Sequence, residues 1–360
     1  MATPKLRFKE FDADYTNTTF EKLKGFSIQS GKSEEKGDTG EFPFYGSTGV
    51  IGYKDIFDYE GKSILIARVG ANAGSLYQID GKYSVSDNTL RLTVSDDTSL
   101  DYLRELLIKF NLNRLVFGTG QPLVTGGMIK KVNIFIPEFT EQTKIASFLS
   151  AVDEKISQLK QKHQLLSQYK QGMMQKLFSQ QIRFKADDGS EFGEWEEIAL
   201  GKIKGVSIAS GKSSHEKLEL AKYYYYGSTG VIGYSNEYDY QGTRILIARV
   251  GHNAGYIYMV SGQYNVSDNT LILELPSNLD YIFIRAFLEK FQLNKLVFGT
   301  GQPLITGSLL KKVVIQVPCL EEQTKIANFL SAIDQKIEVV AQQIEQAKTW
   351  KKGLLQQMFV

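Results

Sequence analysis

The chain has little of what catalytic and metal-binding sites are usually built from. Among its 360 residues there are one cysteine, Cys319, and three histidines, His163, His215 and His252. A single cysteine cannot form an internal disulfide or a cysteine-based zinc site, which fits a reducing compartment. The three histidines do not recur in a repeated pattern, so the sequence does not support a catalytic triad or a histidine metal site. The chain also lacks the Pro-Pro pair of the loop that base methyltransferases use. We therefore expect no catalytic residue and no metal.

Long apolar runs and a strong net charge are also missing. No stretch of about 18 apolar residues occurs, and the first residues are not followed by the apolar run of a secretory signal. We therefore expect a cytoplasmic protein with no membrane contact. The formal net charge of +2 excludes a global basic field, so any contact with DNA has to come from local placement or from a partner's charge.

What the chain does contain is an internal repeat at an offset of about 181 residues. The run Tyr45 to Tyr53 returns as Tyr226 to Tyr234, and roughly 32 of 50 positions match between 45–94 and 226–275. Each half is long enough to bury a core of its own. The sequence therefore predicts a duplicated globular module and a pseudo-two-fold molecule.

Each copy reads as a strand-rich α/β (mixed α+β) domain of roughly 140 residues. Short apolar runs bounded by Gly, Asn and Asp predict strands, and a helical spacing of apolar residues follows them. In the first copy the strands are expected at 50–53, 63–69, 75–79, 82–86, 90–94 and 132–136, and the helix at 101–115.

From Glu141 the apolar residues follow a heptad pattern, and the second copy keeps the same register. More than five apolar heptads are typical of a coiled-coil seam, and 141–178 would form a rod of about 57 Å. Because such a stripe cannot remain in water, we predict that the two helices pair with each other, antiparallel, since parallel pairing would need the intervening domain to span the rod. The predicted seam consists of Ile145, Leu149, Val152, Ile156, Leu159, Leu166, Met173, Leu177, Ile326, Leu330, Ile333, Ile337, Val340, Ile344, Leu354 and Met358.

Several residues interrupt this seam. We interpret His163, Lys170 and Lys351 as register-setting or solvated polar positions. Gly172 and Gly353 weaken the last turns, so we expect fraying or a kink there.

Two glycine-rich motifs look chemical. The runs 30–33 and 210–213 read Ser-Gly-Lys-Ser, but a phosphate-binding loop needs a glycine where Phe26 and Val206 stand, so a nucleotide site is disfavoured. The runs 117–122 and 298–303 follow a helix instead of the first strand of a doubly wound sheet. We interpret them as positioning turns, with a DNA-facing loop as the alternative.

The most specific motif opens each long helix. It contains Pro137, Glu141-Gln142, Ile145-Ala146, Leu149, Asp153 and Ile156, and it returns between Pro318 and Ile337. This pattern resembles the specificity subunit of type I restriction-modification enzymes, and the resemblance covers essentially the whole chain. The segments that lead into each domain, 6–11 and 182–197, are also similar to those of that family.

The resemblance implies a non-catalytic subunit that reads a bipartite double-stranded DNA target. Its two target recognition domains would lie at 1–140 and 181–321, and conserved helices at 141–180 and 322–360 would hold them apart as a ruler. It further implies docking of two methyltransferase subunits and of one or two restriction subunits with an ATP-driven motor. S-adenosylmethionine, ATP and magnesium would be bound by those partners. The competing interpretation is a coiled-coil adaptor with two peptide-binding heads and no DNA.

The two copies are more alike than the target recognition domains of one such subunit usually are. We therefore hypothesise that both read nearly the same sequence, so that the target is an interrupted inverted repeat. Differences concentrate at 34–44 against 214–225. Single differences follow at Lys54, Ala71, Ser75, Gln78 and Lys82 against Ser235, His252, Tyr256, Met259 and Gln263.

Candidates for DNA contact are amides and forked donors suited to base edges, and lysines suited to phosphates. For each of them a turn hydrogen bond is the alternative, and for the two arginines a core-edge ion pair. The candidates are Ser47, Thr48, Lys54, Arg68, Asn72, Asn88, Thr119, Gln121, Lys130 and Lys131 in the first copy, and Ser228, Thr229, Arg249, His252, Asn253, Asn269, Thr300, Gln302, Lys311 and Lys312 in the second.

Overall fold

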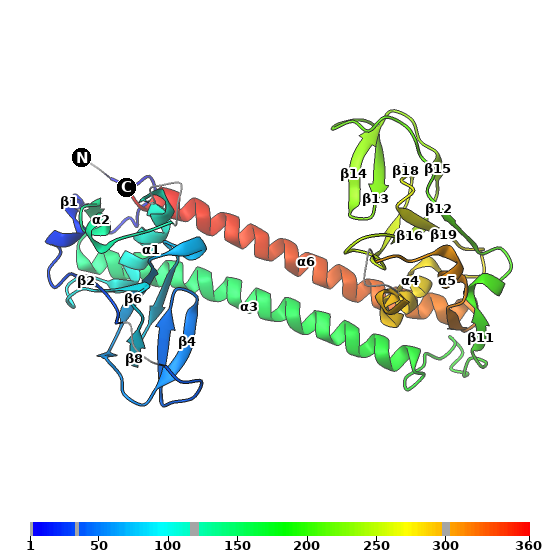
Figure 1. Cartoon of the computed structure of the whole chain (residues 1–360), viewed down its shortest axis with the longest axis horizontal. Coiled ribbons are helices and arrows are strands. Elements are labelled where there is room, and N and C mark those ends of the chain that lie inside the picture. The colour runs from blue at the N-terminus through cyan, green and yellow to red at the C-terminus, as the bar shows by residue number, and fades with distance from the viewer. Residues whose placement is uncertain (1–2, 33–35, 116–121, 297–302) are drawn as a thin grey trace. The chain divides into compact units, whose positions relative to one another are not determined.

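A computed structural model describes residues 3–32, 36–115, 122–296 and 303–360 (Figure 1). The chain divides into two compact units, which we call unit 1 (Met1–Lys160 and Gln342–Val360) and unit 2 (Gln161–Ala341). Each unit holds one globular domain and segments of the two long helices, α3 (Phe139–Phe178) and α6 (Leu320–Met358). The mixed α/β fold predicted from the sequence is confirmed.

Unit 1 contains two four-stranded sheets. The first is antiparallel, in the order β2 (Ser27–Ser30), β9 (Thr89–Thr93), β6 (Ser63–Ala67) and β7 (Leu76–Ile79). The second has the order β4 (Gly49–Lys54), β3 (Phe42–Gly46), β8 (Lys82–Val85) and β5 (Tyr59–Glu60), with β3 and β8 parallel. A short pair joins β1 (Thr16–Thr19) to β10 (Asn133–Ile136). The helices are α1 (Leu100–Phe110) and α2 (Gly126–Lys130), with 3-10 turns η1 (Phe20–Lys22), η2 (Gly70–Asn72) and η3 (Leu112–Leu115).

Unit 2 repeats this topology. Its antiparallel sheet has the order β12 (Ser207–Ser210), β19 (Thr270–Glu274), β16 (Arg244–Ala248) and β17 (Ile257–Val260). Its second sheet has the order β14 (Gly230–Ser235), β13 (Tyr223–Gly227), β18 (Gln263–Val266) and β15 (Tyr240–Gln241), and β11 (Glu196–Ala199) pairs with β20 (Val314–Val317). The remaining elements are α4 (Tyr281–Phe291), α5 (Gly307–Lys311), η4 (Leu200–Lys202) and η5 (Leu293–Leu296).

Within unit 1 the first part of α3 and the last part of α6 run in opposite directions. The ring centroid of Phe148 lies 6.0 Å from that of Trp350, and Leu159, later in α3, lines a groove with Gln343, earlier in α6.

Within unit 2 the end of α3 lies beside the start of α6. Lys170 bonds Asp334, and Leu177 shares a core with Ile326 and Leu330. The antiparallel direction that the sequence predicts is therefore present in each unit.

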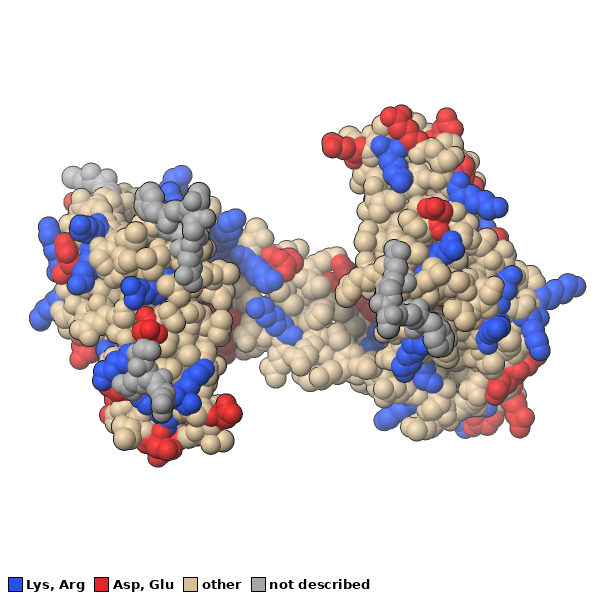
Figure 2. All heavy atoms as spheres, viewed as in Figure 1, with Lys and Arg blue, Asp and Glu red and all other residues tan. Residues whose placement is uncertain are grey.

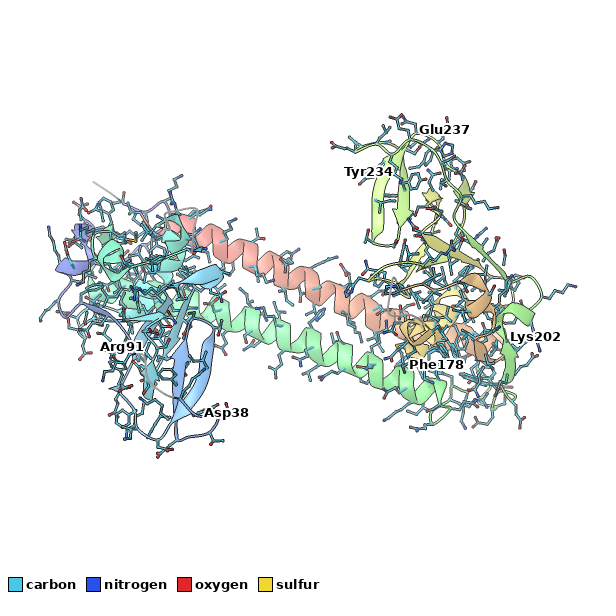
Figure 3. All side chains as sticks on the ribbon, in the orientation of Figure 1. Asp38, Arg91, Phe178, Lys202, Tyr234 and Glu237 are labelled. Carbon is cyan, nitrogen blue, oxygen red and sulfur yellow. The ribbon has the colours of Figure 1, made fainter. Side chains whose placement is uncertain are left out.

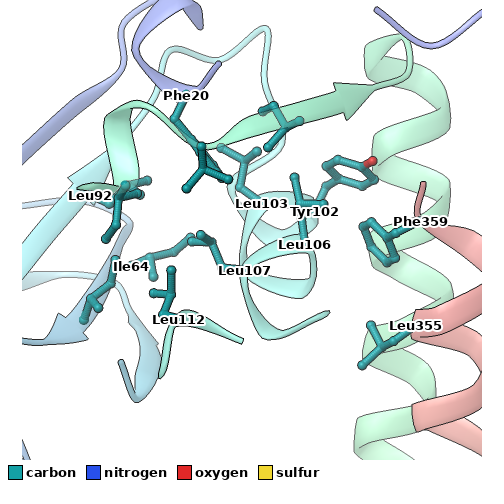
Figure 4. Packing of buried hydrophobic residues seen from close by; sticks show 14 of the residues in the cluster. Phe20, Ile64, Leu92, Tyr102, Leu103, Leu106, Leu107, Leu112, Leu355 and Phe359 are labelled. Carbon is teal, nitrogen blue, oxygen red and sulfur yellow. The ribbon is translucent and has the colours of Figure 1, made fainter. Parts of the chain in front are cut away.

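The hydrophobic core of unit 1 includes the end of α6. Leu355 and Phe359 pack with Tyr102 and Leu106 of α1, and the same cluster extends to Ile64 of β6 (Figure 4). The phenyl ring of Phe359 lies 5.1 Å from the ring of Tyr102. A helix end that the sequence assigns to the seam is thus part of a domain core.

Because the end of α6 packs into the core of unit 1, the predicted seam is not formed by contacts between the two helices alone. Both ends of the heptad run pack into domains, and Met174, one residue from the predicted Met173, is the buried methionine of α3. Leu166, Met173 and Ile337 are half-buried. The other predicted positions are buried: Ile145, Leu149, Val152, Ile156, Leu159, Leu177, Ile326, Leu330, Ile333, Val340, Ile344, Leu354 and Met358.

Three further expectations differ from the structure. The helix expected at 101–115 ends at Phe110, because Asn111 takes a left-handed conformation with φ of 58°. The helices continue past Gly172 and Gly353 to Phe178 and Met358, since the turns beyond these glycines are buried in domain cores.

The seam lysines are not solvated. Lys170 bonds Asp334, and Lys351 bonds Asp153 and the buried Glu105, with side-chain exposures of only 15% and 12%. No described helix is both long and apolar enough to span a membrane.

Candidate nucleic-acid interface

The motif that opens each long helix forms buried contacts that hold the domain to the helix. In unit 1 the carboxylate of Glu141 is fully buried and accepts two hydrogen bonds from Arg7, at 2.8 and 2.7 Å, and one from the Tyr15 hydroxyl at 3.1 Å. Gln142 donates to the Pro137 carbonyl and accepts from the backbone N–H of Ser99, the residue that caps α1. Buried charges need such partners.

Unit 2 builds the same contacts. Arg183 and the Trp195 indole donate to Glu322, at 2.7 and 3.0 Å, and Gln323 links the Pro318 carbonyl to the N–H of Asp280, the capping residue of α4. The motif residues are therefore structural, and the surface available for recognition lies elsewhere.

Five loops of each globular domain lie together, and an arginine of one of them bonds three of the others. We call these loops the loop cluster: residues 30–32, 46–49, 68–72, 86–89 and 122–124 in unit 1, and 210–213, 227–230, 249–253, 267–270 and 303–305 in unit 2. In unit 1 the second loop joins β3 to β4 and the third joins β6 to β7 of the same sheet, whereas the fourth joins β8 of one sheet to β9 of the other.

In unit 1 the guanidinium of Arg68 lies 3.3 Å from the Ser30 hydroxyl and 3.5 Å from the Asp87 carbonyl. The backbone of Arg68 donates to Asn88 at 3.0 Å and accepts from Val124 at 2.8 Å. One residue thus fixes three loops. No carboxylate of the described residues forms a salt bridge with Arg68, so the alternative of a core-edge ion pair is not observed there.

Arg249 makes the same contacts in unit 2. Its guanidinium lies 3.2 Å from the Ser210 hydroxyl and 3.5 Å from the Asp268 carbonyl, while its backbone pairs with Asn269 at 3.0 Å and Ile305 at 2.8 Å. Here too no described carboxylate forms a salt bridge with the arginine. The predicted arginine and asparagine candidates are therefore brought together in both copies.

The glycine of the Ser-Gly-Lys motif has a packing role in this cluster. A Cβ on Gly31 would lie 1.9 Å from the Val85 carbonyl oxygen, and one on Gly211 would lie 2.3 Å from the Ser267 carbonyl oxygen. Only glycine permits this close backbone approach. The motif that looks like a phosphate-binding loop is explained by the approach of this loop to the end of β8 or β18.

The tip of the β3–β4 hairpin adds Ser47 and Thr48 to the cluster. Ser47 is half-buried and its hydroxyl lies 3.4 Å from the Asn88 carbonyl, while Thr48 is exposed. The Tyr77 hydroxyl donates to the Gly46 carbonyl, which fixes the hairpin to the first sheet. Burial raises the pKa of Tyr77 to about 12, so this donor stays protonated at neutral pH.

Buried polar atoms without partners repeat at the base of both clusters. Among the described residues, Nε of Arg68 and Oγ of Ser86 have no hydrogen-bond partner, and neither do Nε of Arg249 and Oγ of Ser267. Such atoms are rare in folded proteins and mark places where water or a ligand completes the bonding. Their recurrence at equivalent positions shows that both copies bury the same polar groups at the base of the cluster.

The structure separates the predicted candidates into groups. Thr48, Asn72 and Asn88 are exposed in unit 1, as are Thr229, Asn253, Asn269 and His252 in unit 2, and Ser228 is half-buried like Ser47. Lys54 lies apart from them, because its ammonium pairs with Asp58 at 3.3 Å.

The paired lysines lie outside the loop cluster. Lys130 and Lys131 are exposed at the end of α2, and Lys311 and Lys312 are exposed at the end of α5. Thr119, Gln121, Thr300 and Gln302 lie outside the described residues.

Sequence reasoning missed Ser30 and Ser210 as members of the site. Their signal was present, because the Ser-Gly-Lys motif occurs in both copies, but it pointed to a phosphate loop. On the face shown in Figure 2, basic and acidic side chains lie side by side on each unit, as the net charge of +2 leads one to expect. In the described parts of the chain, no group of three or more His, Cys, Asp or Glu side chains is arranged to hold a metal ion.

Comparison with known proteins gives a family match over both copies. The model of the type I restriction modification DNA specificity domain matches residues 19–168 and 193–349. The type I restriction enzyme MjaVIII specificity subunit of Methanocaldococcus jannaschii is 27% identical over 342 residues, covering 81% of this chain and 77% of that protein. A putative type I specificity subunit of Mycoplasma genitalium is 23% identical over 374 residues, covering 99% of this chain and 96% of that protein.

Solved structures share the fold. A crystal structure of the S subunit of a type I restriction-modification system from M. genitalium has a TM-score of 0.70 at 20% identity and covers 100% of this chain and 99% of that one. A chain from a structural study of complex assembly and conformational transition in the type I system has a TM-score of 0.53 at 16% identity, covering 92% and 96%.

Proposed function

The chain belongs to the type I restriction-modification DNA specificity family, and from that premise we propose that its two loop clusters read the two parts of a bipartite DNA target. The observation that carries the proposal is the duplication of the cluster. Arg68 and Arg249 connect the same loops through the same atoms, and exposed Asn and Thr side chains surround each arginine. Amide and hydroxyl groups on loops held by a rigid sheet suit base edges in the major groove.

The near-identity of the clusters supports half-sites that are nearly the same. Within each unit the two long helices run antiparallel. The proposal gives the two domains opposite orientations on the DNA, as an inverted repeat requires. The target proposed is therefore an interrupted, nearly palindromic sequence, with the paired helices acting as the ruler between its halves.

Type I specificity subunits act in complexes with DNA and with methyltransferase and restriction subunits. We propose that two methyltransferase subunits and one or two restriction subunits dock on this chain, and that they bind S-adenosylmethionine, ATP and magnesium. The chain itself contributes recognition and no catalytic group. Its Glu141 and Glu322, the carboxylates of the family motif, are buried in ion pairs and support the domains.

A methylome map tests the proposal. A methylation-free host would express a type I methyltransferase subunit with and without this chain, and single-molecule sequencing would record methylated bases. We expect a two-part motif only when the chain is present, with inverted-repeat halves. A methylation pattern unchanged by the chain would reject DNA reading and favour the adaptor with peptide-binding heads.

Two single variants test which loop cluster reads which half of the methylated DNA motif. Asn88→Ala should relax one half-site and Asn269→Ala the other, each by about 1–3 kcal/mol per affected base pair. Asn236→Ala, an exposed asparagine of unit 2 outside the loop cluster, is the matched control and should leave the motif unchanged.

A further inference from the structure

Unit 2 carries five tyrosines whose rings follow one another across three strands. We call Tyr234, Tyr224, Tyr226, Tyr258 and Tyr256 the tyrosine row. The successive centroid distances are 5.4, 6.0, 5.9 and 5.9 Å. Tyr234, labelled in Figure 3, lies on β14, and the row continues through β13 toward β17.

Two rings of the row pack on the core of the unit, and two others are exposed. Tyr226 and Tyr258 pack on the core formed by Leu246, Val260 and neighbouring residues. By contrast, Tyr224 is 48% exposed and Tyr256 is 59% exposed. Aromatic rings bury a large apolar area in most folds, so exposed rings at two places along one row of rings point to an interaction surface.

The row is continuous with the loop cluster of unit 2. The N–H of Tyr256 donates to the Asn253 carbonyl at 2.8 Å, and the Tyr226 carbonyl accepts from the N–H of Ser267 at 2.9 Å. The Tyr258 hydroxyl donates to the carbonyl of Gly227, next to the hairpin tip. The exposed rings therefore extend the surface that presents the candidate reading loops.

Unit 1 keeps three rings of the row and lacks the two exposed ones, because Tyr53 is the equivalent of Tyr234. Tyr45 and Tyr77 correspond to Tyr226 and Tyr258, and their centroids are 6.0 Å apart. At the positions of Tyr224 and Tyr256, unit 1 has Pro43 and Ser75. The rings of Tyr224 and Tyr256 are therefore present in unit 2 and not in unit 1.

We propose that the tyrosine row is a duplex-DNA contact surface specific to unit 2, with Tyr224 and Tyr256 as specificity-determining residues of its half-site. The inference rests on the proposed function. Tyrosine hydroxyls donate to phosphate oxygens, and apolar ring faces pack against thymine methyl groups. Continuity with the reading loops favours duplex DNA over a protein partner. Unit 2 then discriminates at a position that unit 1 tolerates, so the two half-sites differ there.

The test uses the full-length chain with its methyltransferase partner. After the wild-type motif is mapped, plasmids carrying every single substitution within and beside each half-site are methylated by the wild type, Tyr256→Ser and Tyr224→Ser. We expect discrimination at one or two positions of a single half-site to fall by about fivefold or more, with the other half-site unchanged. Tyr238→Ser, an exposed tyrosine of unit 2 outside the row, is the control and should match the wild type. Ser75→Tyr should add selectivity to the opposite half-site.

Three results would overturn the inference. The first is an unchanged discrimination profile in both row variants, whose thermal unfolding should match the wild type because the rings are exposed. The second is loss of methylation at every site while the chain's own DNA binding stays intact, which would assign the row to a protein partner. The third is the absence of any chain-dependent motif for the wild type, which would also refute the proposed function.

Discussion

The buried carboxylate of Glu141 makes a prediction about stability that is confined to one unit. Glu141→Gln keeps the shape of the side chain but removes its charge, and Arg7 loses its ion-pair partner. Removing one member of a buried ion pair costs about 3–5 kcal/mol. Arg7 remains 14% exposed and keeps its hydrogen bond to the Ala13 carbonyl at 2.6 Å, so we expect a smaller cost of about 2–3 kcal/mol.

Hydrogen exchange measured by mass spectrometry can resolve this effect, because each unit has its own opening free energy. Amides of the unit 1 core, such as those of β6 and α1, should exchange roughly 30- to 150-fold faster in Glu141→Gln. Peptides of β16 and α4 in unit 2 should keep their wild-type rates. The reciprocal variant, Glu322→Gln, should reverse the pattern, with a smaller effect because Arg183 is 22% exposed.

A double variant separates the cost of leaving Arg7 unpaired from the cost of changing the two side chains. Arg7→Met combined with Glu141→Gln removes both charges, so it should cost less than the sum of the two single changes. If Glu141→Gln alone changes exchange in unit 1 by less than about threefold, the ion pair does not stabilise the domain as argued.

Three other changes follow from the contacts. Gly31→Ala places a Cβ 1.9 Å from the Val85 carbonyl oxygen and should cost about 1–3 kcal/mol in thermal unfolding, while Gly172→Ala, in open space on α3, should be neutral or stabilising. Burial opposes ionisation of Asp58, but Ser84 and Lys54 outweigh it and its pKa is lowered. Its stabilisation is therefore present above about pH 4 and lost as the pH falls through the lowered value, so Asp58→Asn should destabilise at about pH 6 and the difference from the wild type should shrink as the pH is lowered further in exchange measurements. Residues 1–180 alone should homodimerise, because Leu177 and Phe178 can take the places of Met358 and Phe359; a species that sediments as a monomer at micromolar concentration would contradict this.

Much of the fold follows from local sequence signals. The strands expected at 63–69 and 90–94 are observed within two residues as β6 and β9, because apolar runs between glycine, asparagine and aspartate have few alternatives. The strand β3 was missed, since Pro43 and the neighbouring aromatics do not alternate with polar residues. Boundaries that depend on a single backbone angle, such as that of Asn111, are not visible in periodicity.

The site was less predictable, because its contacts join distant parts of the chain. The motif of Glu141 and Gln142 was recognisable as a pattern, but their partners Arg7 and Ser99 lie far away in sequence. Likewise the approach of Gly31 to Val85 depends on how two sheets meet. Pattern reasoning identified several residues of the loop cluster and could not show that Arg68 connects the loops.

The contacts also change what the similarity of the two copies implies. Arg68, Gly31 and Ser86 recur in unit 2, but each makes or lines an internal contact there, so their recurrence reports shared architecture. Similarity of the half-sites can be judged only from exposed residues of the cluster. Thr48, Asn72 and Asn88 have exposed equivalents in unit 2 and argue for shared bases. His252 and Tyr256 replace Ala71 and Ser75 on the same surface, so under the proposed function these positions set the bases at which the inverted repeat is broken.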